Sequence, residues 1–227
     1  MMSSENRAQP MSSPDLRSAA IADATPCIQV WDIATGKIAL LMDHSREAAA
    51  HAFSIGRHTL ISSGLPGALD IWDVAGRRCV ASIPAHSSQV NCVAISPDGM
   101  IAASGSTDNT IKLWSLKKGS WLATLKGHKR PVWALAFSLD GKTLASGSGD
   151  HSVRLWNVSL RREVAILRGF TNRHPMSPMR LGLNFSPDGS DLAVVTQRGD
   201  LLLYRAATLD EVARRPKDGQ ALPNADQ

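Results

Sequence analysis

The chain contains 227 residues, of which 43% are hydrophobic and 20% are charged, and its formal net charge at pH 7 is +5. This length and composition are typical of a soluble globular domain and exclude a fibrous, coiled-coil or wholly disordered chain. The apolar runs have the length of strands, far below the roughly 20 residues that a membrane-spanning helix needs. Residues 1–15 are polar and lack the apolar segment of a secretory signal.

The three cysteines, Cys27, Cys79 and Cys92, lie far apart in the sequence and form no C-x-x-C pair. This spacing argues against a disulfide framework and against a zinc site. The sequence also contains no phosphate-binding loop, no dinucleotide-binding fingerprint and no H-E-x-x-H motif. We therefore expect a cytoplasmic protein that binds no metal and no cofactor.

Strand-like segments begin near the N-terminus and continue almost to the end of the sequence. The first three cover residues 16–23, 27–33 and 37–42. Only the polar residues 1–15 precede them, so we expect the first structural unit to lack one strand. We expect residues 1–15 and the polar tail at residues 215–227 to be disordered.

Segments that end in an aromatic residue recur at a nearly constant interval. Trp31, Trp72, Trp114 and Trp156 are 41, 42 and 42 residues apart, and Tyr204 ends a fifth copy 48 residues later. The last interval is longer because it contains an extended loop at residues 171–179. A repeat of about 42 residues indicates a fold that is assembled from one small unit per repeat.

Each full repeat contains four short strands that are separated by polar turns. In the best-preserved repeat the predicted strands cover residues 90–96, 101–106, 110–116 and 121–126. Strands of this length, at a spacing of about 8 to 12 residues and without a helical period, are typical of barrels, sandwiches and propellers.

Two further markers keep the same register in successive repeats. Asp98-Gly99, Asp140-Gly141 and Asp188-Gly189 each place their glycine 15 residues before the strand-ending aromatic residue. Asp-Gly between two strands indicates a tight antiparallel hairpin, because glycine tolerates the positive φ that such turns need. His44, His86 and His128 each precede the next strand-ending tryptophan by 28 residues.

These observations predict an all-β protein, a β-propeller of four-stranded antiparallel blades. Four complete blades are predicted at residues 45–84, 87–126, 129–168 and 176–214, and a partial blade at residues 16–42. The ring is expected to be incomplete. Three explanations stay open: the sequence is a fragment of a larger propeller, the arc is completed by another chain or by self-association, or five blades close into a strained ring.

The repeats resemble those of the WD40 family. The resemblance rests on Gly127-His128 with Leu155-Trp156-Asn157, on Ala85-His86 with Leu113-Trp114-Ser115, and on the pairs Trp31-Asp32 and Trp72-Asp73. It covers roughly residues 16–214. The repeats are similar to those of bacterial WD40 proteins, which occur alone or behind a serine/threonine kinase domain, but the sequence contains no kinase motif.

The resemblance implies a structural chain of four hydrogen-bonded side chains in each of the two best repeats. The implied members are His86, Ser106, Asp108 and Trp114 in one repeat, and His128, Ser148, Asp150 and Trp156 in the next. A serine, a histidine and an aspartate could also indicate a hydrolase. However, no G-x-S-x-G motif is present and the same set occurs twice, so we expect no enzymatic activity.

Two other repeats are expected to lack the complete chain. The repeat at residues 45–84 has Gly64 and Pro66 where the serine and the aspartate would stand. The last repeat has Arg198 in place of the aspartate, although Thr196 at the serine position is expected to keep a fragment of the chain. We therefore expect the outer blades to be less stable than the two in the middle.

The resemblance also implies a partner-binding face, because WD40 proteins usually bind partners through the loop before each blade and the turn between its second and third strands. The corresponding residues are Ser88, Gln89, Asn91, Thr107, Lys129, Arg130, Trp133 and Gly149, and the extended loop adds Arg173 and His174. Trp133 is the strongest candidate, because an aromatic residue beside two cations is typical of a binding hot spot. Its alternative role is to fill the central channel, and residues 171–179 are either a specificity loop or a surface insertion.

The predicted function is a non-catalytic scaffold or regulatory platform for other proteins. The charge distribution supports one alternative, because residues 111–227 contain 18 Lys/Arg and 10 Asp/Glu, whereas residues 1–110 contain 7 and 10. A propeller that binds nucleic acid or a small molecule would use this basic half. Nucleic acid is the less favoured partner, because the basic residues are dispersed and few aromatic residues accompany them.

Overall fold

The computed structural model describes residues 11–12, 18–22, 27–32, 35–43, 51–54, 59–64, 67–74, 76, 78–168, 181–196 and 200–205, which are called the described residues. Within them the chain forms β-strands and no helix, in agreement with the all-β prediction. The strands make five antiparallel sheets, and in each sheet every strand pairs with the next one in the sequence. No helix in this part of the chain is long and apolar enough to cross a membrane.

The first two sheets precede the best-preserved repeats. The first contains β1 (Met11–Ser12), β2 (Ser18–Ala22), β3 (Cys27–Asp32) and β4 (Lys37–Asp43). The second contains β5 (His51–Ser54), β6 (Thr59–Gly64), β7 (Ala68–Asp73) and β8 (Arg78–Pro84).

The other three sheets follow in chain order. The third contains β9 (Val90–Ile95), β10 (Ile101–Ser106), β11 (Ile111–Ser115) and β12 (Ser120–Leu125). The fourth contains β13 (Val132–Phe137), β14 (Thr143–Ser148), β15 (Val153–Asn157) and β16 (Arg162–Leu167). The fifth contains β17 (Gly182–Phe185), β18 (Asp191–Val195) and β19 (Leu201–Arg205).

The Asp-Gly hairpins between the first and second strands are confirmed. Gly99, Gly141 and Gly189 have φ angles of 67°, 68° and 74°, in the left-handed region that glycine adopts without steric cost. The aspartate before each glycine also stabilises its turn. Asp98 Oδ1, for example, accepts hydrogen bonds from Ser96 Oγ at 2.5 Å and from the Met100 backbone N–H at 2.9 Å.

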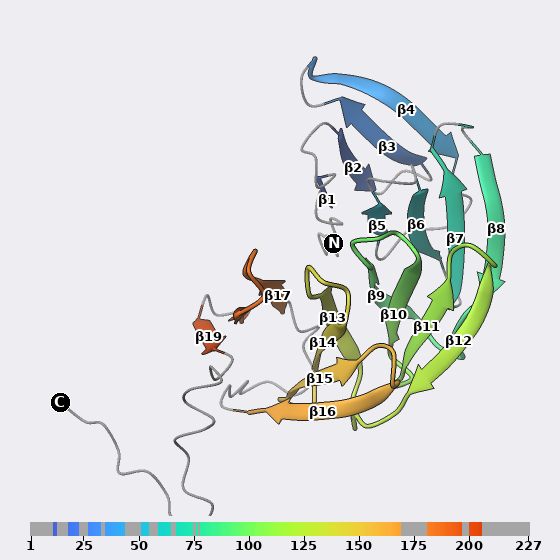
Figure 1. Cartoon of the computed structure of the whole chain (residues 1–227). Coiled ribbons are helices and arrows are strands. Elements are labelled where there is room, and N and C mark those ends of the chain that lie inside the picture. The colour runs from blue at the N-terminus through green and yellow to red at the C-terminus, as the bar shows by residue number, and fades with distance from the viewer. Residues whose placement is uncertain are drawn as a thin grey trace, which may run out of the picture.

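The sheets stand side by side around a common axis and form an open arc, not a closed ring (Figure 1). Strands β5, β9 and β13 lie on the inner side of the arc, and β4, β8, β12 and β16 form its rim. Each four-stranded sheet therefore has the arrangement of a propeller blade. The predicted propeller fold, with an incomplete ring, agrees with this architecture.

Neighbouring sheets pack face to face through alternating side chains. We call the face that carries the strand-ending tryptophan, or Tyr204, the front face of a sheet, and the opposite face its back face. Ile111 and Leu113 on the back face of β9–β12 pack against Leu144 and Trp156 on the front face of β13–β16. The same relation joins Leu69, on the back face of the second sheet, to the front face of the third. The hydrophobic core is thus a series of layers between blades.

One detail of the blade count differs from the sequence prediction, and another lies outside the described residues. The first sheet has a first strand after all, because β1 pairs antiparallel with β2 through Met11 and Ser12. Strand pairing uses backbone groups, so a short polar segment can occupy the free edge of β2 without a hydrophobic pattern. In the last blade the described residues form three strands, and the predicted fourth strand falls outside them.

Candidate functional site

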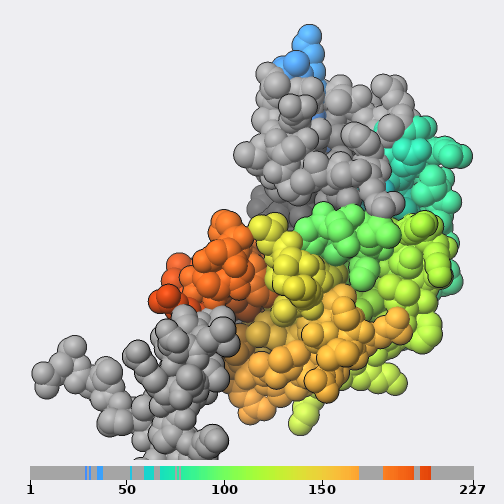
Figure 2. Space-filling view, in the orientation of Figure 1, coloured from blue at the N-terminus to red at the C-terminus, as the bar shows by residue number. Residues whose placement is uncertain are grey.

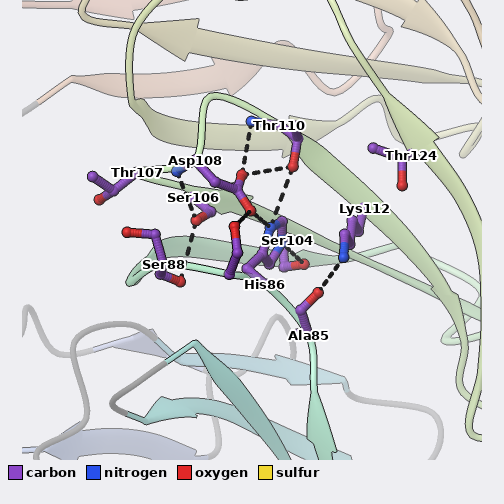
Figure 3. Close-up of polar contacts among 12 residues, drawn as sticks. Ala85, His86, Ser88, Ser104, Ser106, Thr107, Asp108, Thr110, Lys112 and Thr124 are labelled. Atoms are coloured by element: carbon purple, nitrogen blue, oxygen red, sulfur yellow. Dashed lines mark hydrogen bonds and ion pairs between the residues drawn. The ribbon is translucent and has the colours of Figure 1, made fainter.

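A chain of buried hydrogen bonds crosses the third sheet and ends at its loops (Figure 3). Trp114 Nε1 donates to Ser104 Oγ at 2.9 Å, and Ser104 Oγ lies 2.8 Å from His86 Nε2. His86 Nδ1 lies 2.9 Å from Asp108 Oδ2, and Thr110 Oγ1 donates to Asp108 Oδ1 at 2.6 Å. The network therefore joins β11 and β10 to the loop before β9 and to the β10–β11 turn.

The fourth sheet repeats this network with nearly identical distances. Trp156 Nε1 donates to Ser146 Oγ at 2.8 Å, and the same oxygen lies 2.8 Å from His128 Nε2. His128 Nδ1 lies 2.9 Å from Asp150 Oδ2, and Ser152 Oγ donates to Asp150 Oδ1 at 2.6 Å. Two adjacent repeats thus place the same donor and acceptor types in the same geometry.

The serine that the sequence reasoning chose for each network was wrong. Ser106 Oγ donates to the backbone carbonyl of Gln89 at 2.8 Å, and Ser148 Oγ donates to that of Arg130 at 2.8 Å. The reason is the strand register, because Trp114 lies opposite Ala102. Ser106 is four residues further along β10, roughly 13 Å away, whereas Ser104 is only two residues away on the same face.

A repeated spacing in the sequence could have identified the correct serines. Ser62, Ser104 and Ser146 each stand ten residues before a strand-ending tryptophan, and thus recur in three repeats. The residues chosen from the sequence, Ser106 and Ser148, recur in only two. The sequence reasoning also missed Thr110 and Ser152, whose hydroxyls donate to the aspartates.

The second sheet contains part of the same network. Trp72 Nε1 donates to Ser62 Oγ at 2.8 Å, and both residues are buried. His44 and Pro66 lie outside the described residues. In the last sheet Thr196 takes a different partner, because its Oγ1 donates to Asp200 Oδ2 at 3.0 Å. Thr196 therefore contacts the β18–β19 turn, and among the described residues it does not keep the predicted fragment of the chain.

The hydrogen-bond pattern is satisfied by a neutral His86. Ser104 Oγ already accepts the N–H of Trp114, so its own proton can point to His86 Nε2, and the imidazole proton then stands on Nδ1 towards Asp108. Burial lowers the pKa of His86 below its usual value, against the opposing effect of Asp108. Every member of this buried chain is then satisfied.

The aspartates of both networks are held in the ionised form. Burial acts to raise the pKa of Asp108, but hydrogen bonds from Thr110 and His86 outweigh it, so that the pKa is lowered. The pKa of Asp150 is lowered in the same way, against burial, by His128, Ser152 and the backbone N–H of Lys129. The carboxylates therefore act as acceptors that hold the surrounding turns in place.

The serine hydroxyls of the networks cannot reach a substrate from the protein surface. Ser104 and Ser146 are fully buried, and each hydroxyl lies between a tryptophan and a histidine. A catalytic serine needs an exposed hydroxyl next to donors that can bind an oxyanion. The geometry therefore favours a structural role for the Ser-His-Asp sets.

The networks hold the loops that carry the candidate partner-binding residues. The Lys129 backbone N–H donates to Asp150 Oδ2 at 3.0 Å, the Arg130 carbonyl accepts from Ser148, and Gly149 N–H donates to the Pro131 carbonyl at 3.0 Å. The side chains of Lys129 and Arg130 are exposed. The loop before β13 thus presents two cations on a fixed backbone.

Trp133 and its counterpart in the preceding sheet have different surroundings. Asn91 stands 42 residues earlier, and its side chain donates to Thr107 Oγ1 and to the Val132 carbonyl, both at 3.1 Å. Trp133 is partly buried against the core between the fourth and fifth sheets. No side chain of the described residues accepts its indole N–H, and the adjacent Gly149, which stands 42 residues after Thr107, has no side chain that could do so.

The other predicted face residues lie on the same side of the two middle sheets. Ser88 is partly buried and Gln89 is exposed, and the Gln89 carbonyl accepts the backbone N–H of Thr107 at 2.9 Å. Arg173, His174 and the rest of the extended loop at residues 171–179 lie outside the described residues.

Comparison with known families agrees with this geometry. The family model described as WD domain, G-beta repeat, matches residues 77–115 and 119–157. Each match begins one residue before the rim strand of one sheet, β8 or β12. It ends with the strand of the next sheet that carries the tryptophan, β11 or β15. No curated protein matches the chain. WD40 domains generally mediate protein–protein interactions. The family match, the blade-like sheets and the repeated network together support the assignment of residues 77–157 to the WD40-repeat family.

Proposed function

We propose that this protein is a non-catalytic platform that binds an acidic segment of another protein at the loops of its third and fourth sheets. The observation that carries the proposal is the position of Trp133. Its indole lies beside Gly149, where an added Cβ would stand 3.5 Å from Trp133 Nε1 and 3.6 Å from Arg130 Cβ. Trp133, Arg130 and the Gly149 backbone thus adjoin one another.

The chemistry of this surface supports an anionic partner. Trp133 offers an apolar ring and an N–H that has no acceptor among the described residues, and such amphipathic aromatic residues are common at binding interfaces. Lys129 and Arg130 add two exposed positive charges. A carboxylate or a backbone carbonyl of a partner would complete the hydrogen bonding of the indole.

The rigidity of the surface supports specific binding. The backbone from His128 to Pro131 is held by hydrogen bonds to Ser148, Gly149 and Asp150. A surface that is ordered before binding loses less conformational entropy when the partner arrives. In this proposal the buried networks serve function indirectly, by fixing the loops.

The test compares proteins captured from a cell extract by the parent chain and by three variants. Arg130→Glu and Trp133→Ala remove the proposed contacts, and Lys118→Glu is the matched control. Lys118 is exposed in the β11–β12 turn, at the other end of the sheet. The expected result is a partner that the parent chain and Lys118→Glu retain, and that Arg130→Glu and Trp133→Ala lose.

Two outcomes would contradict the proposal. One is a partner that binds the Arg130→Glu and Trp133→Ala variants as well as it binds the parent chain. The other is retention of a labelled DNA or RNA duplex by the parent chain, with an affinity that falls steeply with salt, and no protein partner that depends on Trp133. That second result would favour a nucleic-acid-binding function.

A further inference from the structure

The back face of the last sheet is an exposed apolar surface. Leu201 and Leu203 on β19 are 60% and 67% exposed, and Val195 on β18 is 39% exposed. Val195 pairs with Leu201, and Ala193 pairs with Leu203, so the four side chains adjoin on one face. Isolated exposed leucines are common on proteins, but a group on one flat sheet face indicates an association surface.

The same positions are buried in the inner sheets. Leu201 stands three residues before the strand-ending Tyr204, and Leu203 stands one residue before it. Ile111 and Leu113 have the same two positions before Trp114 in the third sheet. Ile111 and Leu113 are at most 1% exposed, because the front face of the fourth sheet covers them. The last sheet therefore carries the side chains of a blade interface, and no other sheet of the described residues covers them.

The front face of the first sheet shows the complementary feature. Trp72, Trp114 and Trp156 are 7%, 4% and 2% exposed, whereas Trp31 is only partly buried. The Trp31 indole donates at 3.2 Å to Gln29 on its own strand, and not to a serine of the neighbouring strand. In the inner sheets, this tryptophan-bearing face is the one that covers the back face of the preceding sheet.

We propose that the back face of β17–β19 in one copy packs against the front face of β1–β4 in a second copy. This contact continues the interface that already joins the successive sheets of the chain. The first and last sheets lie at the two ends of the arc in Figure 1, and Figure 2 shows the last sheet, in orange and red, at one side of the described part of the molecule. The interface is heterologous, since each copy contributes a different surface, and it assembles two or more copies head to tail.

The first experiment measures the molar mass of the purified protein over a wide range of concentration, by light scattering after size exclusion. The parent chain is expected to form assemblies of two or more copies that dissociate on dilution. The double variant Leu201→Glu/Leu203→Glu is expected to be monomeric, with an association constant at least ~100-fold weaker, because two carboxylates would be buried without partners. Val164→Glu is the matched control, since Val164 is 64% exposed on the rim strand β16.

A mixing experiment tests the head-to-tail geometry. Trp31→Glu removes the front-face contact, and Gln29→Lys provides a second front-face variant if Trp31→Glu does not fold. A front-face variant and the Leu201→Glu/Leu203→Glu variant should each be monomeric alone. Their mixture should form a complex of one copy of each, because each variant retains the surface that the other lacks.

Three results would overturn the proposal. These are a parent chain that stays monomeric at every concentration, a Leu201→Glu/Leu203→Glu variant that assembles like the parent chain, and folded front-face variants that still assemble by themselves. The last result would indicate contact between two identical back faces. Arg130→Glu and Trp133→Ala should leave assembly unchanged, so the failure of this proposal is distinguishable from that of the proposed function.

Discussion

Ser104 Oγ lies between His86 Nε2 at 2.8 Å and Trp114 Nε1 at 2.9 Å, and it links the loop before the third sheet to the centre of that sheet. The hydroxyl both donates and accepts, so neither neighbour is left with an unpaired nitrogen. Ser146 has the same position between His128 and Trp156. These serines, and not Ser106 and Ser148, are the central members of the two networks.

Ser104→Ala is therefore expected to lower the free energy of unfolding by about 1–3 kcal/mol, because it leaves two buried nitrogens without a partner. Ser106→Ala is the matched control and should cost less. The Gln89 carbonyl to which Ser106 donates keeps the N–H of Thr107. Urea unfolding followed by circular dichroism measures both effects. A larger loss for Ser106→Ala would show that the network has been assigned incorrectly.

The protonation of His86 predicts how stability depends on pH. Its pKa in the folded state lies below that of an unfolded histidine, about 6.5, because the imidazole is buried. As the pH falls below about 6.5, the unfolded state binds the proton first, so the free energy of unfolding decreases. The depressed pKa of Asp108 adds a further loss at pH values below about 4.

This dependence is measured by urea unfolding between pH 5 and pH 8. The variant His86→Gln cannot titrate in this range, and its stability should change less between pH 7 and pH 5 than that of the parent chain. If the two curves are parallel, His86 does not contribute to the pH dependence.

The packing between the fourth and fifth sheets predicts the effect of a small added side chain. A Cβ at Gly147 would overlap the Leu181 side chain, whereas a Cβ at Gly149 would meet only ordinary contacts. Gly147→Ala should therefore lower the free energy of unfolding by about 1–3 kcal/mol through overpacking. Gly149→Ala should change it by less than about 0.5 kcal/mol. Thermal unfolding of the two variants side by side checks this difference, and equal melting temperatures would contradict it.

The distribution of the networks predicts where the chain opens most easily. The third and fourth sheets contain complete networks and are covered by a neighbouring sheet on both faces. The last sheet has an exposed back face. Backbone amides of β10, β11, β14 and β15 should thus exchange with deuterium more slowly than those of β18 and β19. Mass spectrometry of peptic fragments measures the exchange, and equally slow exchange in β18 would contradict the prediction.

The sequence by itself determined the repeat, the strands and the turns. The strand-ending aromatic residues and the Asp-Gly pairs depend on local backbone preferences and on the alternation of apolar residues, and both can be recognised within one repeat. The predicted strand at residues 101–106 coincides with β10, and the predicted turns at Gly99 and Gly141 have the expected positive φ.

Only the tertiary structure decided which residues meet across strands and between sheets. Ser104 and Ser106 have the same side-chain type and lie on the same face, and the register of β10 against β11 selects Ser104 as the partner of Trp114. Leu203 and Leu113 each stand one residue before the strand-ending aromatic residue, yet Leu203 is exposed and Leu113 is buried. Burial depends on the presence of a neighbouring sheet, and no pattern within a single repeat contains that information.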